Sequence, residues 1–326
     1  MQSEYQTAGL MLCFTLSRLP VFKAEGDSMS AAIFGELAAC AILFGLSVLL
    51  CKLPRRERGG RIAAAVCAVY YTAALSLLLC ETVRSTQYSF PGFYSTAPMV
   101  ISLAAAAAYC ASMGPEGCSR AACAAVVMTL IAFVLMIAGV AGGFDGERIE
   151  FADADRFEQF GRELWKSLSR SCELPLLVTL MRRRSKSPVK ASAMYFFARA
   201  ALSGTAFLIC MAVLGDHSRT GQPLFSLAAY AKTALIERFD ALVILFRTLC
   251  MLISAAALLT GLRICLSEIR EKAERAMPLG AAVSALSALI LLGADLSPLP
   301  LWSTGAGIAL AAGISAARKG RGSSGI

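Results

Sequence analysis

Histidine and charged residues are scarce in this chain. The only histidine among its 326 residues, His217, falls in a connection between two apolar segments. A histidine-dependent metal site or a catalytic triad inside the apolar segments is therefore excluded. Charged residues make up 16% of the sequence, well below the ~25% that is usual in soluble domains. The shortage of charge argues against a soluble domain. The shortage of histidine argues against an enzyme, and we expect neither catalytic residues nor a cofactor.

Sequence motifs for metal or nucleic-acid binding are also missing. The 12 cysteines form no CxxC pair. Almost all of them stand inside apolar segments, as Cys13, Cys67 and Cys250 do, where cysteine acts as a small hydrophobic residue. The net charge is +9, but the basic residues sit in the connections and form no basic face with interleaved aromatic residues. We therefore expect no metal site and no nucleic-acid partner.

Long apolar stretches dominate the sequence. Hydrophobic residues make up 57% of the chain, and its mean hydropathy is +0.65. About 20 helical residues cross the ~30 Å hydrocarbon core of a bilayer, and runs such as 31–51 and 191–214 reach that length with few charges. The sequence therefore predicts an all-α integral membrane protein, with a single polytopic domain over residues 1–320 embedded in the lipid bilayer. The ten predicted spans are 7–22, 30–51, 62–83, 95–113, 120–142, 168–181, 191–214, 240–265, 277–294 and 299–317.

The basic residues predict the orientation of these spans. Lys and Arg are concentrated after the second, sixth and tenth spans, whereas the loops after the first, third, seventh and ninth are poorer in them. Basic loops stay in the cytoplasm, so both termini of this multi-pass protein are predicted to be cytoplasmic. The first span lacks a basic leader and a convincing cleavage site, so we expect no signal peptide. The basic clusters are Lys52 to Arg61, Arg182 to Lys190 and Arg318 to Arg321.

The longest connection, residues 144–167, separates two halves with five predicted spans each. An odd number of spans in each half gives the halves opposite orientations, as in transporters built from inverted repeats. We therefore predict an inverted 5+5 repeat, with a first unit over 1–143 and a second over 168–318.

Apolar residues at helical spacing mark the end of this connection. Phe157, Phe160, Leu164 and Leu168 recur among charged residues, which fits an amphipathic helix on the outer membrane surface that offers a docking surface to a partner subunit. A solvated loop with one helical turn fits the same residues. At the end of the chain, the Gly- and Ser-rich residues 321–326 are expected to form a disordered tail.

Each half opens with a span that holds a charge, a leucine and a proline in a row. Proline removes a backbone donor and interrupts a helix, and interrupted helices in corresponding places of two halves are typical of a transporter binding site. The alternative is a coincidence, with both prolines merely near helix ends. The two runs are Ser17 to Pro20 and Ser171 to Pro175, and the predicted ligand-binding residues are Ser17, Arg18, Ser171 and Glu173.

Charged residues inside the spans are further candidates, because a charge at the bilayer centre costs at least ~2.5 kcal/mol and usually faces the bundle interior or water. Some of these side chains lie near span ends, where a purely structural alternative is that they extend to the membrane interface. Arg247 lies deeper and requires a buried partner or a water-filled cavity. The candidates are Arg18, Glu36, Glu81, Arg84, Glu173, Arg199 and Arg247, of which Glu36, Glu81, Arg84 and Arg199 are near span ends.

Several short runs follow one another in a fixed order along the chain. In chain order, they are Thr96 and Pro98, then Tyr109 with Gly114, Glu116 and Arg120, then Glu173 with the basic cluster after it, and last Pro223 and Leu227 followed by Ile236 to Leu242. Their order and spacing, over roughly residues 6–300, resemble those of the spore germination permeases. These proteins are the B-type subunits of nutrient germinant receptors of the GerA class.

The resemblance implies a LeuT-like fold of the amino acid, polyamine and organocation transporter superfamily, with a site where helices one and six unwind. It also implies a function: a subunit in the inner spore membrane that senses a small, amino-acid-like germinant and promotes germination. The implied partners are an A-type membrane subunit and a C-type lipoprotein. Arg18 and Glu173 would then hold the two ends of a zwitterion, or pair with each other in the empty state.

The chain departs from the family pattern in three places. Phe14 to Arg18 stand where the family usually has a glycine, Arg247 stands where it commonly has tryptophan, and the link 52–61 is short. These departures predict a divergent member with altered or lost ligand recognition. Two other functions fit the same fold, since fold does not fix function. One is a stand-alone secondary transporter for amino acids or cations, and the other is a scaffold that only anchors partners.

Overall fold

A computed structural model of the chain describes residues 4–19, 29–52, 60–89, 95–148, 156–184, 187–215, 223–231, 239–269 and 277–294. Within these ranges the regular structure is helical throughout, as predicted. The helices are α1 (Glu4–Arg18), α2 (Met29–Lys52), α3 (Gly60–Ser89), α4 (Thr96–Ser112), α5 (Gly114–Val140), α6 (Arg156–Arg170), α7 (Leu174–Arg184), α8 (Pro188–Leu214), α9 (Pro223–Tyr230), α10 (Phe239–Ile269) and α11 (Met277–Gly293), with short 3-10 turns η2 (Ala141–Gly143) and η3 (Gly146–Arg148).

Five of these helices, α2, α3, α5, α8 and α10, are long and apolar enough to cross a membrane. The shorter helices α4 and α11 are apolar as well. Together they correspond to the predicted spans two to five and seven to nine. The predicted tenth span, 299–317, the tail 321–326 and His217 lie outside the described residues.

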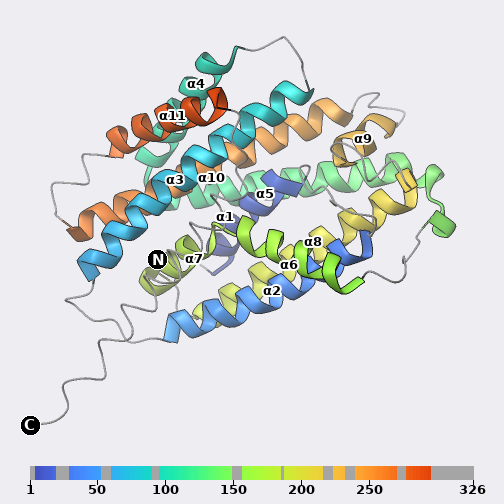
Figure 1. Cartoon of the computed structure of the whole chain (residues 1–326), viewed down its shortest axis with the longest axis horizontal. Helices are drawn as coiled ribbons and strands as arrows, with labels where there is room; N and C mark the ends of the chain where they lie inside the picture. The colour runs from blue at the N-terminus through green and yellow to red at the C-terminus, as the bar shows by residue number, and fades with distance from the viewer. Residues whose placement is uncertain are drawn as a thin grey trace, which may run out of the picture.

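The helices pack in two groups (Figure 1). In the first group, α2 lies along α6 and α8, and α1 contacts α7 and α8. In the second group, α10 and α11 both pack against α3 and α4. Helix α1 also contacts α10 and α5, so the first helix of the chain lies between the two groups.

Small residues set the distance between neighbouring helices. A Cβ atom on Gly261 of α10 would lie 2.7 Å from Cδ1 of Leu176 and 3.1 Å from the ring of Tyr71. A Cβ on Gly9 of α1 would lie 2.9 Å from Sγ of Cys123 on α5. In membranes, helix association depends on such close packing, because burial of apolar surface gives no driving force between helices.

The helix at the end of the long connection, α6, packs against the rest of the chain. It lies along α2, where a Cβ on Gly35 would come within 2.9 Å of the Leu164 backbone nitrogen. Leu168 packs against the main core, and the largely buried Lys166 and Glu163 pair at 2.8 Å. Residues 156–170 thus form a helix rather than a solvated loop, and the chain itself covers part of the apolar side of this helix.

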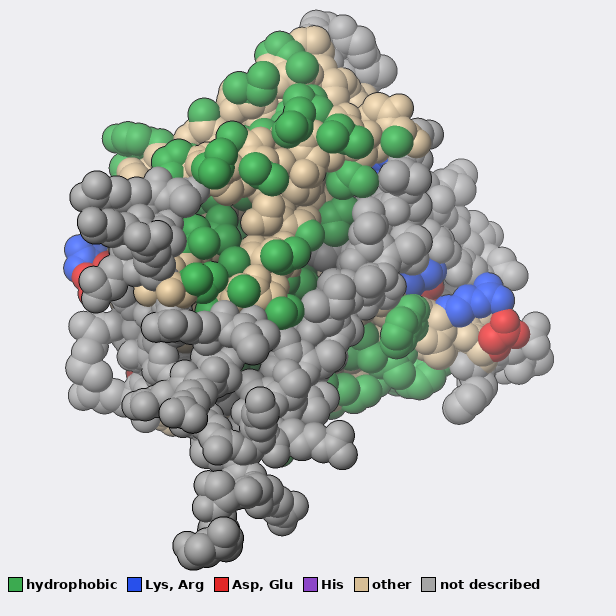
Figure 2. Space-filling view, turned by 60° about the vertical axis from the view of Figure 1, so that its left-hand side comes forward, with side chains coloured by type: hydrophobic (Ala, Val, Ile, Leu, Met, Phe, Trp, Pro, Cys, Tyr) green, Lys and Arg blue, Asp and Glu red, His purple; other side chains and the backbone are tan. Residues whose placement is uncertain are grey.

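The surface of the molecule carries many apolar side chains. Hydrophobic side chains are spread over the upper part of the face in Figure 2, and the exposed large residues include Ile131 and Val134 on α5 and Leu286 and Ile290 on α11. Exposed apolar surface of this extent marks contact with lipid or a partner. It agrees with a multi-pass membrane protein.

The run from Tyr109 to Arg120 covers the end of α4, the linking residue Met113 and the first turns of α5. Gly114 has a φ of 82°, a conformation that favours glycine, and Pro115 follows in the first turn of α5, where proline is well tolerated. Tyr109, Glu116 and Arg120 are exposed around this turn. Part of the pattern that carries the family resemblance is therefore also what a tight helix–helix turn requires.

Candidate functional site

The sixth predicted span is interrupted in the structure. Helix α6 ends at Arg170 and α7 begins at Leu174, with three non-helical residues between them. Pro175 in the first turn of α7 has no backbone N–H to continue a helix. The connection is tight, because the Cys172 nitrogen donates to the Arg170 oxygen at 2.9 Å and the Ser171 hydroxyl donates to the Ser167 oxygen at 2.8 Å. The break therefore places Glu173 at a fixed position in the middle of the bundle.

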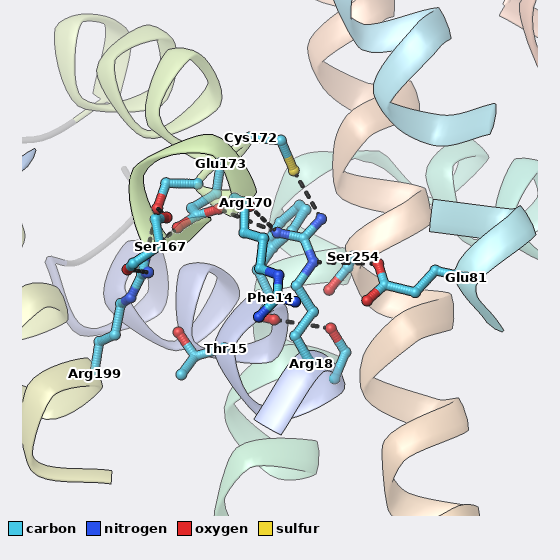
Figure 3. A network of polar contacts seen from close by, with 12 residues as sticks. Phe14, Thr15, Arg18, Glu81, Ser167, Arg170, Cys172, Glu173, Arg199 and Ser254 are labelled. Carbon is cyan, nitrogen blue, oxygen red and sulfur yellow. Dashed lines mark hydrogen bonds and ion pairs between the residues drawn. The ribbon is translucent and has the colours of Figure 1, made fainter. Parts of the chain in front are cut away.

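Glu173 is 2% exposed and is surrounded by donors (Figure 3). Its Oε1 accepts hydrogen bonds from Nη1 of Arg199 at 2.5 Å and from the hydroxyl of Tyr195 at 2.8 Å. Its Oε2 lies 3.5 Å from Nη1 of Arg18. This second oxygen has an ion-pair partner but no hydrogen bond, so one carboxylate oxygen of Glu173 is held more loosely than the other.

Arg199 on α8 connects the break to α2. Its Nε donates to Oε1 of Glu36 at 2.7 Å, its Nη1 to the hydroxyl of Ser171 at 2.9 Å, and its Nη2 to the hydroxyl of Ser167 at 3.3 Å. The Ser167 hydroxyl in turn donates to the other oxygen of Glu36. Arg199 and Glu36 are each 3% exposed. They are buried against each other and do not extend to a membrane interface.

Arg18, the last residue of α1, contacts both sides of the break. Its Nη1 donates to the carbonyl oxygen of Arg170 at 2.5 Å and its Nη2 to Sγ of Cys172 at 3.0 Å. Its Nε lies 3.7 Å from Oε2 of Glu81 on α3, whose side chain is 16% exposed. Because the carboxyl end of a helix carries partial negative charge, the guanidinium group stabilises the end of α6. Figure 3 shows Arg18 extending between Cys172 and Glu81.

Arg247 on α10 is hydrogen-bonded to the backbone at the end of α1. Its Nε donates to the carbonyl oxygen of Ser17 at 2.9 Å, and its Nη1 donates to the hydroxyl of Ser85. The Ser17 hydroxyl is used within α1, since it donates to the Phe14 oxygen at 2.9 Å. The ring of Phe225 on α9 lies 5.7 Å from the guanidinium carbon, within cation–π distance.

These interactions join buried charges from six segments of the chain into one network. Along it, negative and positive groups alternate from α2 through α8, the break and α1 to α3. We call this set the charged cluster, and its members are Arg18, Glu36, Glu81, Glu173, Arg199 and Arg247. Among the described residues, no three His, Cys, Asp or Glu side chains are grouped so as to hold a metal ion.

The structure places the four predicted ligand-binding residues in or beside this cluster. Arg18, Ser171 and Glu173 contribute side chains, whereas Ser17 contributes its backbone carbonyl. Arg84, the remaining charged candidate, lies half-buried on α3.

The sequence pattern did not indicate Tyr195 and Ser167, which both bind cluster members. Each lies four residues before a candidate, Arg199 or Ser171, so helical spacing was the signal that could have indicated them. No comparable local signal marks Tyr70, whose hydroxyl donates to the Cys172 oxygen at 3.1 Å.

No protein-family model and no curated protein matches the sequence. Solved structures match its fold, among them those of two transporters. A substrate-bound, outward-open Na+-coupled sialic acid symporter superposes with a TM-score of 0.61 at 14% identity, over 94% of this chain and 78% of the symporter. A nucleobase-cation-symport-1 family transporter, closed with bromovinylhydantoin bound, gives a TM-score of 0.55 at 14% identity, over 96% and 75%. The chain has a LeuT-like transporter fold.

The LeuT-like fold agrees with the superfamily that the sequence resemblance implies. An identity of 14% shows the fold alone, so membership of the spore germination permeases stays a prediction. In LeuT-like transporters the substrate lies near the bilayer midplane, where discontinuous helices expose backbone groups. The corresponding place in this chain is the break between α6 and α7, beside the end of α1.

Proposed function

We propose that this chain is a secondary transporter for a small charged or zwitterionic solute, which binds at the break between α6 and α7. One observation carries the proposal: a span of a LeuT-like fold is interrupted at Ser171 to Glu173, and the interruption holds a buried carboxylate between two arginines. Buried ionisable groups are expensive in a membrane and commonly mark solute or ion pathways.

The arrangement of the ion pairs provides a switch. Glu173 pairs with Arg199 inside the first helix group, whereas the Arg18–Glu81 pair at 3.7 Å and the Arg247–Ser17 hydrogen bond connect α1 to the second group. A solute that competes for Arg18 or for the loosely held oxygen of Glu173 weakens one set of contacts relative to the other. It thereby favours one of two helix arrangements, because a ligand shifts a conformational equilibrium by its differential affinity.

Uptake into liposomes tests this function. The purified chain is reconstituted alone, and uptake of a mixture of radiolabelled amino acids is measured with and without an inward Na+ gradient. We expect Glu173→Gln and Arg18→Met to reduce uptake at least tenfold, since each removes a charge at the break. Glu158→Gln on the exposed side of α6 is the matched control, because its partner Arg162 is 63% exposed. Unchanged uptake by both cluster variants at normal protein levels would contradict the proposal.

A second candidate is the germinant-receptor subunit in the inner spore membrane, with both termini cytoplasmic. It is favoured by the exposed positions of Tyr109, Glu116 and Arg120 at the α4–α5 turn, which leave this part of the matching run accessible to an A-type or C-type subunit. Copurification with those subunits and a nutrient response of spores that is lost in Glu173→Gln support the receptor. Solute uptake by this polypeptide alone supports the transporter.

A further inference from the structure

Arg247 differs from the other arginines of the charged cluster. Arg18 and Arg199 each face carboxylates, but within the described part of the chain no carboxylate lies within ion-pair distance of Arg247. Glu81, one helical turn before Ser85 on α3, pairs with Arg18 instead. Arg247 is only 5% exposed, and its Nη2 makes no hydrogen bond. It is a buried positive charge that no carboxylate of the described residues contacts directly.

Such a group is costly in the membrane interior. A buried donor without an acceptor loses its hydration and gains nothing in return, and a buried charge without a counter-ion is more expensive still. The contacts to Ser17 and Ser85 are with neutral oxygens, which orient the guanidinium group without neutralising it. A residue that is fixed in direction but unpaired in charge is suited to receive an anion from outside the chain.

The remaining donors have the geometry that a carboxylate needs. A guanidinium group has five N–H bonds in one plane. With one N–H at Nε and one at Nη1 engaged, both N–H groups of Nη2 and one of Nη1 remain. Two donors on adjacent nitrogens form the parallel pair of hydrogen bonds typical of arginine and carboxylate. Phe225, 5.7 Å from the guanidinium carbon, adds an apolar wall that limits access of water.

We propose that Arg247 binds the carboxylate group of a small organic solute. The inference rests on the proposed function, because it assigns one end of the transported molecule. The position fits that assignment: Arg247 holds the carbonyl of Ser17, and the next residue, Arg18, contacts the break at Cys172 and Glu173. The bound carboxylate gives Arg247 a counter-ion in direct contact, at the junction of α1, α3 and α10.

Thermal unfolding of the purified full chain in detergent tests the proposal. The probes are acetate, propionate and L-alanine, with n-propylamine and chloride at equal ionic strength as controls. We expect the carboxylate probes to raise the unfolding temperature and the two controls to leave it unchanged. In Arg247→Met the carboxylate shift is lost, and in Arg247→Lys the apparent Kd rises at least about tenfold, because a point charge replaces a bidentate donor. Arg162→Met, at the exposed end of an α6 ion pair, keeps the full shift.

The stability of Arg247→Met without any probe separates binding from a structural role. If Arg247 serves to bind a solute and has no counter-ion in the empty protein, Arg247→Met unfolds at the same or a higher temperature than the natural chain. If Arg247 is needed only for packing, Arg247→Met unfolds at a lower temperature than the natural chain, and carboxylate probes still raise that temperature. That result overturns the proposal, as does a natural chain that responds to no carboxylate probe or equally to chloride.

The failure of this inference differs from the failure of the transporter function. If carboxylates bind through Arg247 but no solute enters the liposomes, the carboxylate site is supported and the transporter function is contradicted. If Arg247→Met does not change uptake, the carboxylate site is contradicted and the transporter function is supported.

Discussion

Glu173 is the residue on which the buried interactions converge. Its carboxylate contacts both Arg18 and Arg199, and Tyr195 donates a further hydrogen bond. Loss of this one charge leaves two buried guanidinium groups with fewer partners. Glu173 is therefore expected to stabilise the fold in addition to any role in binding a solute.

We expect Glu173→Gln to destabilise the protein by roughly 3 kcal/mol, the usual effect of removing one partner of a buried ion pair. The measurement is the unfolding temperature of the purified variant in detergent. Glu158→Gln serves as the control, because its pair with Arg162 is exposed, with side chains 75% and 63% accessible, and such pairs contribute under ~1 kcal/mol. Equal unfolding temperatures for the two variants would show that the Glu173 contacts do not stabilise the fold.

The sequence indicates these residues only in part. Arg18 and Glu173 could be singled out because each precedes a Leu-Pro pair in a predicted span. Their partners could not be assigned, since Arg199 meets Glu36 across 163 positions of sequence. Such pairings depend on how the helices pack, and local spacing carries no information about contacts of that range.

At the scale of elements, α6 shows how a helix with many charges can pack one side against the bundle while its other side stays exposed. Its composition predicts a surface helix, because Glu158, Arg162, Glu163 and Lys166 alternate with its apolar residues. In the structure, Glu163 and Lys166 neutralise each other at 2.8 Å. The sequence thus predicts the helix itself but not the helix against which it packs.

The contact between α2 and α6 depends on Gly35. We expect Gly35→Ala to destabilise the protein by about 1–3 kcal/mol, because the new Cβ would lie 2.9 Å from the Leu164 nitrogen and backbone cannot move aside as a side chain can. Because α6 ends at the break, the same variant should also weaken solute binding. Unfolding temperature and uptake are the two measurements.

Gly45→Ala on the same helix is the control for this prediction. Its Cβ would have no neighbour within 4 Å, so the variant should be neutral or more stable by up to ~1 kcal/mol through helix propensity. If both variants unfold at the same temperature, Gly35 does not set the distance between α2 and α6.

For the whole molecule, the distribution of Lys and Arg predicts the orientation in the membrane. We expect alkaline phosphatase fused after Arg184 to be inactive and the same reporter fused after Leu214 to be active, because basic loops remain in the cytoplasm. Green fluorescent protein at the same two positions should give the opposite pattern. Active phosphatase at both positions would show that α8 does not cross the bilayer in the predicted direction.

More of the overall architecture than of the site could be predicted from the sequence. Apolar length alone located α2, α3, α8 and α10, because spans must match the thickness of the bilayer. The interruption of the sixth span also has a local cause in Pro175. The assignment of helices to two groups has no such local signal, since it follows from which small residues meet across the bundle.

The charged cluster has a consequence for the response to voltage. Its three carboxylates balance its three guanidinium groups when all six are ionised, and moving one elementary charge through a membrane potential involves ~2.3 kcal/mol per 100 mV. A cluster with zero net charge feels no such force when it moves as a unit. Electrogenic behaviour of this protein should therefore report the valence of the cargo and its accompanying ions, and a neutral cargo without a co-ion should generate no current.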